Sequence, residues 1–367
     1  MKILAAVTEG KGALFDVRPL QLGIPRNDEV RVKIIATGIC HTDLAVRDQQ
    51  ISVAMPVVLG HEGAGIVEQV GSNVSHVQVG DKVILSLGFC GQCSHCASGL
   101  PTYCDEHFEY NWKASRADGS VALHDQGQPV HSHFFGQSSF ANYAVVSASS
   151  LVKVADDAPL EFLGPFACGV MTGAGAVINT LKPSPGTAIA VFGMGAVGLS
   201  AIMAARVMGC NPIIAIDTQA SRLAVAQEMG ATHLIDASQG DATEQVMALT
   251  GGQGVKYSVE CAGHVGVMAS AVNVLEEGGE AVLTGVVAPG TQLSLDVMQL
   301  IRGRVVRGSI MGDAAPSVFL PRLVDLFKQG RFPVDKMVRF YDLEQINQAI
   351  ADIHSGDTIK AVLRMPH

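Results

Sequence analysis

A glycine-rich turn between an expected strand and an expected helix constrains the fold of this 367-residue chain more than any other feature. Residues 187–192 (TAIAVF) are typical of a buried strand, and residues 193–198 (GMGAVG) follow at once with the spacing G-x-G-x-x-G. A helical apolar pattern then reaches Met208, and a second strand is expected over residues 212–216, before Asp217. Such glycines let backbone N–H groups approach a pyrophosphate at a helix start, so the order predicts a dinucleotide-binding unit. A glycine-rich packing turn is the alternative.

The acidic residue after the second strand indicates which dinucleotide would bind. Asp217 is expected to accept hydrogen bonds from both adenosine ribose hydroxyls and to repel a 2′-phosphate, which favours NAD over NADP. Arg222 could stack near the adenine. Because an arginine near this position can also accommodate a 2′-phosphate, NADP remains an alternative cofactor. The turn residues expected at the cofactor are Gly193, Gly195, Ala196, Val197 and Gly198.

Strands and helices continue to alternate after this turn. Helices are expected over residues 221–229 and 264–275, and strands over residues 233–235, 256–259, 280–283 and 305–310. This alternation predicts an α/β unit over residues 169–310 with a doubly wound parallel sheet. Because ligands bind beyond the carboxyl ends of such strands, Cys261 and Val286 are expected to line the cofactor.

Composition and charge exclude several classes of protein. Apolar residues make up 48% of the chain, which argues against disorder, and the length predicts about two domains. The net charge of −9 and the lack of a basic stripe speak against a nucleic-acid partner. The uncharged stretch over residues 188–205 could just span a membrane, but its glycines break it into strand, turn and helix. No signal peptide is recognised at the N-terminus, so a cytoplasmic protein without a membrane partner is expected.

Four of the eight cysteines lie within 15 residues, with the spacing C-x2-C-x2-C-x7-C. They are Cys90, Cys93, Cys96 and Cys104. Four thiolates from one loop can enclose a zinc ion completely, which leaves no place for substrate and predicts a structural site. An iron–sulfur cluster also uses four thiolates, and disulfides or free thiols are further alternatives.

A second group of possible ligands is scattered along the sequence. Cys40, His61 and Cys168 together supply two thiolates and an imidazole, the ligand set of a catalytic zinc with an open fourth position. Asp43 could hold the His61 ring as an outer carboxylate. Glu62 could modulate the charge of the zinc or enter its shell, or it could be a surface carboxylate.

These motifs together resemble the zinc-dependent medium-chain alcohol dehydrogenase family. The resemblance rests on GICHTD (38–43), GHEGAGIVEQVG (60–71), GDKV (80–83), the four-cysteine loop, FACGVMTGAGA (166–176), GMGAVG (193–198) and SGDTIKAVL (355–363). Within the family, CHTDLAVRDQ (40–49) and FFGQSSFANYAVV (134–146) are most similar to the benzyl (aryl) and terpene alcohol dehydrogenase branch.

The resemblance implies a domain layout. A mainly-β, GroES-like catalytic domain is expected over residues 1–168 and is completed by residues 311–367. A Rossmann NAD-binding domain is expected between them, over residues 169–310.

The resemblance also implies roles for individual residues. Two zinc ions per chain are expected, one catalytic (Cys40, His61, Cys168) and one structural (Cys90, Cys93, Cys96, Cys104). Thr42 would bond the hydroxyl of the alcohol, and His41 and Lys360 would reach the cofactor phosphates. Ala45 stands where many members carry the outer histidine of a proton relay, so the relay beyond Thr42 needs cofactor hydroxyls and water, or another base.

The implied function is reversible NAD-linked oxidation of primary alcohols (aromatic, allylic or otherwise apolar) to aldehydes. It would proceed by hydride transfer from a zinc-bound alkoxide, in a homodimer or homotetramer paired near residues 292–304. Glutathione-dependent formaldehyde oxidation is the alternative enzyme, and a nucleotide-binding structural protein is the non-enzyme alternative. Residues 105–133, which include Trp112, could form a substrate lobe or a solvated surface loop.

Overall fold

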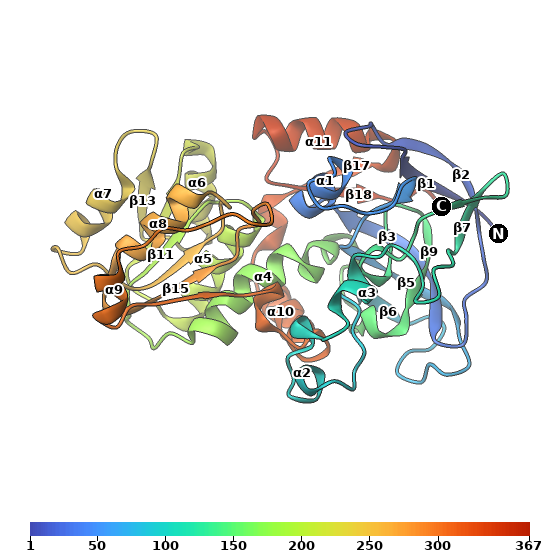
Figure 1. Cartoon of the computed structure of the whole chain (residues 1–367), viewed down its shortest axis with the longest axis horizontal. Coiled ribbons are helices and arrows are strands. Elements are labelled where there is room, and N and C mark those ends of the chain that lie inside the picture. The colour runs from blue at the N-terminus through green and yellow to red at the C-terminus, as the bar shows by residue number, and fades with distance from the viewer. The chain divides into compact units, whose positions relative to one another are not determined.

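The structure, a computed structural model, describes all residues 1–367, and the chain divides into two compact units (Figure 1). Unit 1 consists of Met1–Cys168, Ala315–Asp325 and Val338–His367. Unit 2 consists of Gly169–Ala314 and Leu326–Met337.

Unit 1 is built mainly from two sheets. The first has the order β4-β1-β2-β7-β8, with β1 (Lys2–Thr8), β2 (Asp16–Leu22), β4 (Val57–Val58), β7 (Leu123–Asp125) and β8 (Gln128–Val130). The second has the order β10-β6-β5-β3-β18-β17, and β9 also pairs with β3. Its strands are β3 (Glu29–Gly38), β5 (Gly63–Val70), β6 (Lys82–Leu85), β9 (Tyr143–Ser147), β10 (Leu151–Lys153), β17 (Val338–Asp342) and β18 (Lys360–Arg364).

The central strand of the second sheet brings together segments from both ends of the chain. β3 alternates between fully and partly buried residues and pairs antiparallel with β5, β9 and β18. Val362 of β18 lies opposite Gly38, so the late segment of the chain completes the sheet two residues before Cys40. In Figure 1 the red strand β18 accordingly runs beside the blue strand β3.

Short helices fill the connections of unit 1. They are α1 (His41–Arg47), α2 (Ser94–Ala97), α3 (His107–Asn111) and α11 (Ile346–Ser355), while α10 (Pro316–Lys328) passes from unit 1 into unit 2. α11 buries Ile346, Ala349, Ile350 and Ile353, the i, i+3, i+4, i+7 pattern of an amphipathic helix, and packs against β17 and β18.

Unit 2 contains one six-stranded sheet in which every pairing is parallel. The order is β13-β12-β11-β14-β15-β16, formed by β11 (Ile189–Phe192), β12 (Ile213–Asp217), β13 (His233–Asp236), β14 (Val255–Glu260), β15 (Leu275–Leu283) and β16 (Val305–Gly308). This is the strand order of a doubly wound dinucleotide-binding fold, and it reverses between β11 and β14, where such folds bind their ligands.

Unit 2 also contains the helices α4 (Gly169–Gly175), α5 (Ala196–Met208), α6 (Ala220–Met229), α7 (Ala242–Leu249), α8 (Val265–Asn273) and α9 (Val297–Ile301). Of these, α5, α6, α7 and α8 pack on the sheet. α5 packs on β11 and β12, and α8 packs on β14 and β15. The core between them includes Phe192, Ile216, Val246 and Val272.

The fold class predicted from the sequence is confirmed: a mainly-β part accompanies a doubly wound parallel sheet. The helix expected over residues 264–275 is shorter, because Leu275 already pairs with Val255 as the first residue of β15. The return to unit 1 occurs at Ala315 rather than at residue 311. Leu326–Met337 also belongs to unit 2, where Lys336 pairs with Glu228 at 3.0 Å.

None of the helices combines the length and the apolar character needed to cross a membrane. The uncharged stretch over residues 188–205 is accounted for by β11, the glycine turn and most of α5.

Candidate functional site

Three separate segments of unit 1 bring Cys40, His61 and Cys168 together. Cys40 lies between the end of β3 and the start of α1, His61 precedes β5, and Cys168 follows a 3₁₀ turn at Gly164–Ala167. Their ligand atoms and a carboxylate oxygen of Glu62 all lie within 4.8 Å of one another. The structure therefore gathers the four residues that the sequence placed around a catalytic zinc.

Asp43 fixes the orientation of the His61 ring. The ring atom Nδ1 lies 2.9 Å from Asp43 Oδ1, and both side chains are completely buried. The same carboxylate accepts hydrogen bonds from the backbone N–H groups of Gly60 and Cys40, each at 3.0 Å. Asp43 thus connects two of the ligand segments and leaves the other ring nitrogen to face the cluster.

The residues of this cluster fit a metal ion. His61 Nε2 is buried and has no hydrogen-bond partner, which is costly for an imidazole nitrogen unless an ion or ligand completes it. A hydrogen bond from Cys168 lowers the pKa of Cys40, against the effect of burial. The same hydrogen bond, together with burial, raises the pKa of Cys168. Two thiols that compete for one proton, beside an open imidazole nitrogen, form a donor set that zinc prefers.

Glu62 is paired with a lysine from the last strand. Lys360 Nζ lies 2.5 Å from Glu62 Oε2 and donates a further hydrogen bond to the carbonyl of Ile39 at 3.0 Å. Burial raises the pKa of Glu62 to about 7, against the opposing charge of Lys360. Glu62 is therefore a buried part of the cluster rather than a surface carboxylate. The expected contact of Lys360 with the cofactor phosphates stays a prediction.

The first turn of α1 carries the two residues expected to serve substrate and cofactor. Thr42 is half-buried and His41 is exposed, so the helix directs them into different environments. Ala45 is half-buried on the same helix, and its methyl group can neither accept nor donate a proton.

Two phenylalanine rings, which sequence reasoning did not assign to the site, pack against His61, and Trp112 packs against both of them. The ring of Phe135 stacks on the imidazole at 4.6 Å, and Phe134 meets it edge-on at 5.6 Å. Trp112 contacts Phe135 at 5.1 Å and Phe134 at 5.9 Å. Trp112 therefore packs against the rings that contact His61 rather than projecting from a solvated loop. Phe108 of the same segment is 61% exposed.

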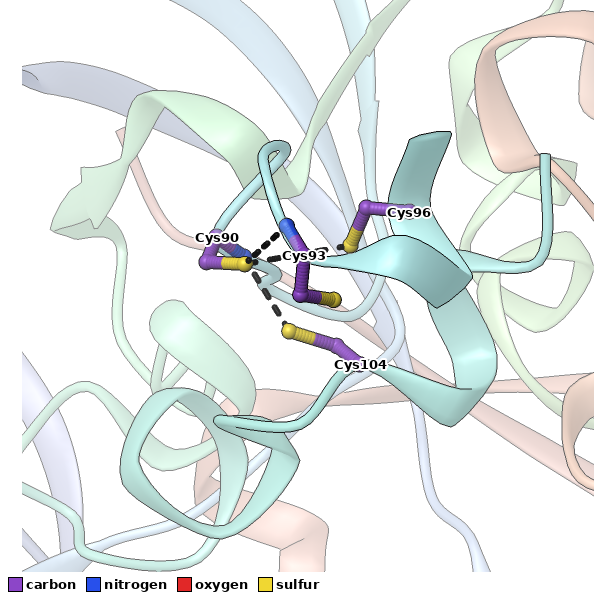
Figure 2. A group of neighbouring side chains, drawn as sticks. All are labelled: Cys90, Cys93, Cys96 and Cys104. Atoms are coloured by element: carbon purple, nitrogen blue, oxygen red, sulfur yellow. Dashed lines mark hydrogen bonds between the residues drawn. The ribbon is translucent and has the colours of Figure 1, made fainter. Parts of the chain in front are cut away.

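The four cysteines of residues 90–104 form a second cluster, and Figure 2 shows their sulfur atoms facing one another. The four sulfurs lie within 4.8 Å, and Cys90 Sγ and Cys96 Sγ are 4.0 Å apart. Tetrahedral zinc with Zn–S bonds of about 2.3 Å holds its sulfurs about 3.8 Å apart. A polynuclear iron–sulfur cluster would need wider spacing, so the geometry fits a single ion.

Backbone N–H groups of the same loop point at these sulfurs. Cys90 N–H donates to Cys104 Sγ at 3.3 Å, and Cys93 N–H donates to Cys90 Sγ at 3.4 Å. Backbone hydrogen bonds, the largest from Asp105, lower the pKa of Cys93 to about 6, whereas burial raises the pKa of Cys96 to about 12. The loop therefore stabilises negative charge on the sulfur of Cys93, whereas burial opposes it at Cys96 and Cys104.

In unit 2, the glycine turn has the geometry of a dinucleotide cradle. Gly193 adopts a φ of 88°, which favours glycine, and its N–H donates to Ile216 of the neighbouring strand at 2.8 Å. A side chain at Gly198 would meet the carbonyl oxygen of Gly193 at 1.8 Å, so α5 can approach the strand this closely only with glycine there. Nothing lies within 4 Å of a Cβ built on Gly195, and no side chain caps α5. Ala196 and Val197 open the helix beside this space, which suits a phosphate group.

Asp217 stands at the carboxyl end of β12 and holds the glycine turn. Its Oδ2 accepts the N–H of Met194 at 2.6 Å, and its Oδ1 accepts the N–H of Gln219 at 2.9 Å. Arg222 is half-buried, and its Nε atom has no hydrogen-bond partner. The carboxylate of Asp217 at the end of this strand, beside the glycine turn, is suited to accept hydrogen bonds from ribose hydroxyls.

The ends of β14 and β15 contribute further residues. Cys261 follows β14, where its N–H donates to Phe192 at 2.9 Å, and burial raises its pKa to about 12. Val286 is 59% exposed beyond β15. Glu260, which sequence reasoning missed, accepts the N–H groups of Ala262 and Gly263 and so shapes the turn after β14.

Comparisons with known proteins agree with this geometry. Residues 26–156 match the family model of the alcohol dehydrogenase GroES-like domain, and residues 196–329 match that of the zinc-binding dehydrogenases. The chain is 42% identical over 362 residues to the geraniol dehydrogenase of Castellaniella defragrans, a match that covers 98% of this chain and 96% of that protein. It is 38% identical to the S-(hydroxymethyl)glutathione dehydrogenase of Komagataella pastoris over 100% of this chain and 98% of that protein. The crystal structure of benzyl alcohol dehydrogenase from Acinetobacter calcoaceticus superimposes with a TM-score of 0.96 at 44% identity and full coverage of both chains.

Proposed function

The chain belongs to the zinc-dependent medium-chain alcohol dehydrogenase family, and we propose that it reversibly oxidises primary allylic and aromatic alcohols to aldehydes with NAD. The family resemblance predicted from the sequence is thereby confirmed. The observation that carries the proposal is the buried cluster of Cys40, His61 and Cys168, with the unpartnered Nε2 of the histidine inside it. The geraniol and benzyl alcohol dehydrogenase relatives support the substrate class.

Three ligands from this chain would hold a catalytic zinc and leave a fourth position to the substrate. When bound, zinc supplies Lewis acidity toward an alcohol oxygen, and NAD accepts the hydride. Asp43 holds the imidazole in the tautomer whose Nε2 faces the cluster, with Nδ1 as the hydrogen-bond donor. Lys360 balances the charge of Glu62, so this carboxylate adds no uncompensated negative charge beside two thiolates.

Thr42 is the group proposed to accept the hydroxyl proton of the substrate, at its Oγ1 atom. It lies two residues after Cys40, on the half-buried side of the first turn of α1. Ala45 offers no group to pass the proton onward, so the onward path is proposed to run through cofactor hydroxyls and water. His41, Cys261, Val286 and Lys360 are proposed cofactor contacts.

The preference for NAD is supported by Asp217. Its carboxylate lies at the end of β12 with both oxygens fixed by backbone N–H groups, so it cannot turn aside for a 2′-phosphate. Asp217→Ser is expected to raise the NADP to NAD ratio of kcat/KM by about 10-fold or more. An unchanged ratio would remove Asp217 from cofactor selection.

A second copy of the chain is the proposed partner of unit 2. β16 pairs only with β15 and leaves its other edge open. Beside it, Val297, Met298 and Ile301 are 64%, 55% and 69% exposed, a large apolar exposure for one short helix. Ile301→Glu is expected to produce monomers in light scattering, and a monomeric parent protein would contradict the proposal. A dimer and a tetramer would be separated by the same measurement.

An NAD-reduction screen tests the proposed function. Geraniol and benzyl alcohol are expected to give a kcat/KM about 10-fold or more above that of ethanol. The kcat/KM for hexanol is expected to lie between that for ethanol and those for the other two alcohols. A clear preference for S-(hydroxymethyl)glutathione would instead assign the chain to the activity named for its relative from Komagataella pastoris. NADH binding without turnover of any alcohol would favour a nucleotide-binding structural protein.

Metal analysis completes the test, because two zinc ions per chain are proposed. One equivalent bound only by the four-cysteine cluster would contradict the catalytic site. The cytoplasmic location expected from the sequence stays a prediction.

A further inference from the structure

We propose that Gln137 and Ser86 are positioning residues that brace the second and third ligands of the catalytic zinc against each other. The inference rests on the proposed function in taking Cys40, His61 and Cys168 as the zinc ligands. It adds two buried residues whose hydrogen bonds go to backbone groups rather than to the ligand atoms.

Gln137 bonds the backbone on both sides of His61. Its amide nitrogen donates to the carbonyl oxygen of His61 at 3.0 Å, and its amide oxygen accepts the N–H of Gly63 at 3.1 Å. The same amide nitrogen lies 2.9 Å and 3.0 Å from the carbonyls of Leu85 and Ser86. One side chain, only 1% exposed, thus joins the His61 segment to the end of β6.

Ser86 extends this connection to the third ligand. Its hydroxyl donates to the carbonyl oxygen of Ala167 at 2.9 Å, and Ala167 directly precedes Cys168. Ser86 is also 1% exposed, and its own carbonyl accepts from Gln137. The continuous path His61–Gln137–Ser86–Ala167 therefore links two ligand segments that are more than a hundred positions apart in the sequence.

The backbone that presents Gln137 is held in an uncommon conformation. His133, Phe135 and Ser138 adopt φ values of 68°, 51° and 56°, in the left-handed region that side chains rarely occupy. Such a conformation is strained for a residue with a side chain and persists only where the surroundings determine it. The strained segment makes two contacts with His61. The ring of Phe135 stacks on the imidazole, and the amide nitrogen of Gln137 donates to the backbone carbonyl.

A role in the fold alone would make a different prediction from a role in positioning. If the brace only stabilised unit 1, its loss would lower thermal stability and weaken both zinc sites together. If it positions ligands, its loss weakens the catalytic site and leaves the four-cysteine site unchanged, because no residue of that loop belongs to the path.

The test compares Ser86→Ala with Ser86→Thr and with Gln137→Met, which keeps the length of the side chain and removes both the amide nitrogen and the amide oxygen. Ser258→Ala is the matched control, because this buried hydroxyl also donates to a backbone carbonyl, that of Ala271 at 2.6 Å in unit 2. Zinc affinity of each site is measured by competition with a chelator, and the geometry of the catalytic site by the d–d spectrum of a cobalt-substituted enzyme. Thermal unfolding and NADH binding are recorded in parallel.

Ser86→Ala and Gln137→Met are expected to weaken the catalytic metal by about 10- to 100-fold, the range found for outer hydrogen-bond partners of metal ligands. The cobalt spectrum should shift, Ser86→Thr should restore both properties, and NADH affinity should be unchanged. Parental metal affinity and spectrum in folded Ser86→Ala would overturn the proposal. Equal weakening of both metal sites, or the same change in Ser258→Ala, would also overturn it. Failure of the proposed function is seen separately, as a parent protein that binds a single zinc.

Discussion

The two candidate metal clusters of unit 1 differ in how far apart their residues lie in the sequence. Cys90, Cys93, Cys96 and Cys104 come from one loop, and their sulfurs receive hydrogen bonds from backbone N–H groups of that loop. Cys40, His61 and Cys168 come from three segments and are oriented by residues of still others, such as Gln137 and Lys360. The geometry of the first cluster therefore depends on a single loop, whereas that of the second depends on the fold of the whole unit.

Burial separates the clusters in the same way. Beside the four cysteines, the ion pair of His95 and Asp105 is half exposed, at 50% and 59%. At the other cluster, His61, Asp43 and Glu62 are completely buried. Because buried charges must be paired, the buried cluster needs Lys360 and Asp43 as partners for Glu62 and His61. Charged groups beside the four-cysteine loop can instead be solvated by water. The clusters should therefore fail independently, and the following changes test this, from the largest expected effect to the smallest.

Removing one catalytic ligand should give the largest effect. Cys168→Ala is expected to reduce alcohol oxidation by about 10³-fold or more, because Lewis-acid assistance contributes several kcal/mol to the barrier. One zinc should remain, and NADH should still bind to unit 2, as measured by metal analysis and calorimetry. Normal turnover by this variant would show that the assignment of the ligands is wrong.

Removing the outer carboxylate should give a smaller loss at the same cluster. Asp43→Ala frees His61 Nδ1 and two backbone N–H groups and is expected to weaken the catalytic zinc by about 10- to 100-fold in chelator competition. Asp43→Asn keeps an acceptor oxygen and should lose less. Equal affinity in the alanine variant and the parent would contradict the role of Asp43.

A change in the four-cysteine loop should affect stability more than chemistry. Cys104→Ser is expected to release the loop zinc, to lower the thermal midpoint by several degrees and to make residues 90–104 sensitive to proteases. The catalytic zinc should stay bound, and kcat per folded molecule should change less than 10-fold. If both metals left together, the two clusters would not be independent.

Acid should give the mildest effect, through a residue that belongs to neither cluster. Glu29 accepts two hydrogen bonds from Arg116 (2.6 and 2.8 Å) and one from His133 (3.0 Å). Burial alone would raise the pKa of Glu29, but these partners hold it well below its ordinary value of 4.5. A lowered folded pKa means that the stabilisation is fully present above about pH 4.5 and is lost as the pH falls toward the folded pKa.

Urea unfolding of the metal-free protein below pH 4.5 should therefore show a free energy that falls by at most about 1.4 kcal/mol per pH unit through this group. Glu29→Gln should have a smaller slope in that window. An identical slope in both proteins would show that the carboxylate is not the group responsible.

The sequence could predict what depends on short spacing. The glycine turn, Asp217 and the four-cysteine loop each lie within a few tens of residues, and local geometry ties such residues together. Cys40, His61 and Cys168 were grouped by residue type as a possible zinc ligand set, and the family resemblance supported that grouping, since nothing in their separation predicts that they meet.

The residues that the sequence did not reveal act through the tertiary fold. Gln137 and Ser86 bond to carbonyl oxygens, which every residue has, so no pattern of residue types marks their partners. Phe135 reaches His61 only because several residues of its segment adopt left-handed conformations. Lys360 was expected at the cofactor, and its pairing with Glu62 depends on the register of β18 against β3.

The position of β18 between β3 and β17 also sets an order of events during synthesis of the chain. The four-cysteine loop can take up its metal as soon as Cys104 has left the ribosome. The other cluster lacks the cation that neutralises Glu62 until residue 360 has been translated and β18 has entered the sheet. A nascent chain should thus complete its two candidate metal clusters at separate times, with the cluster of Cys40, His61 and Cys168 completed last.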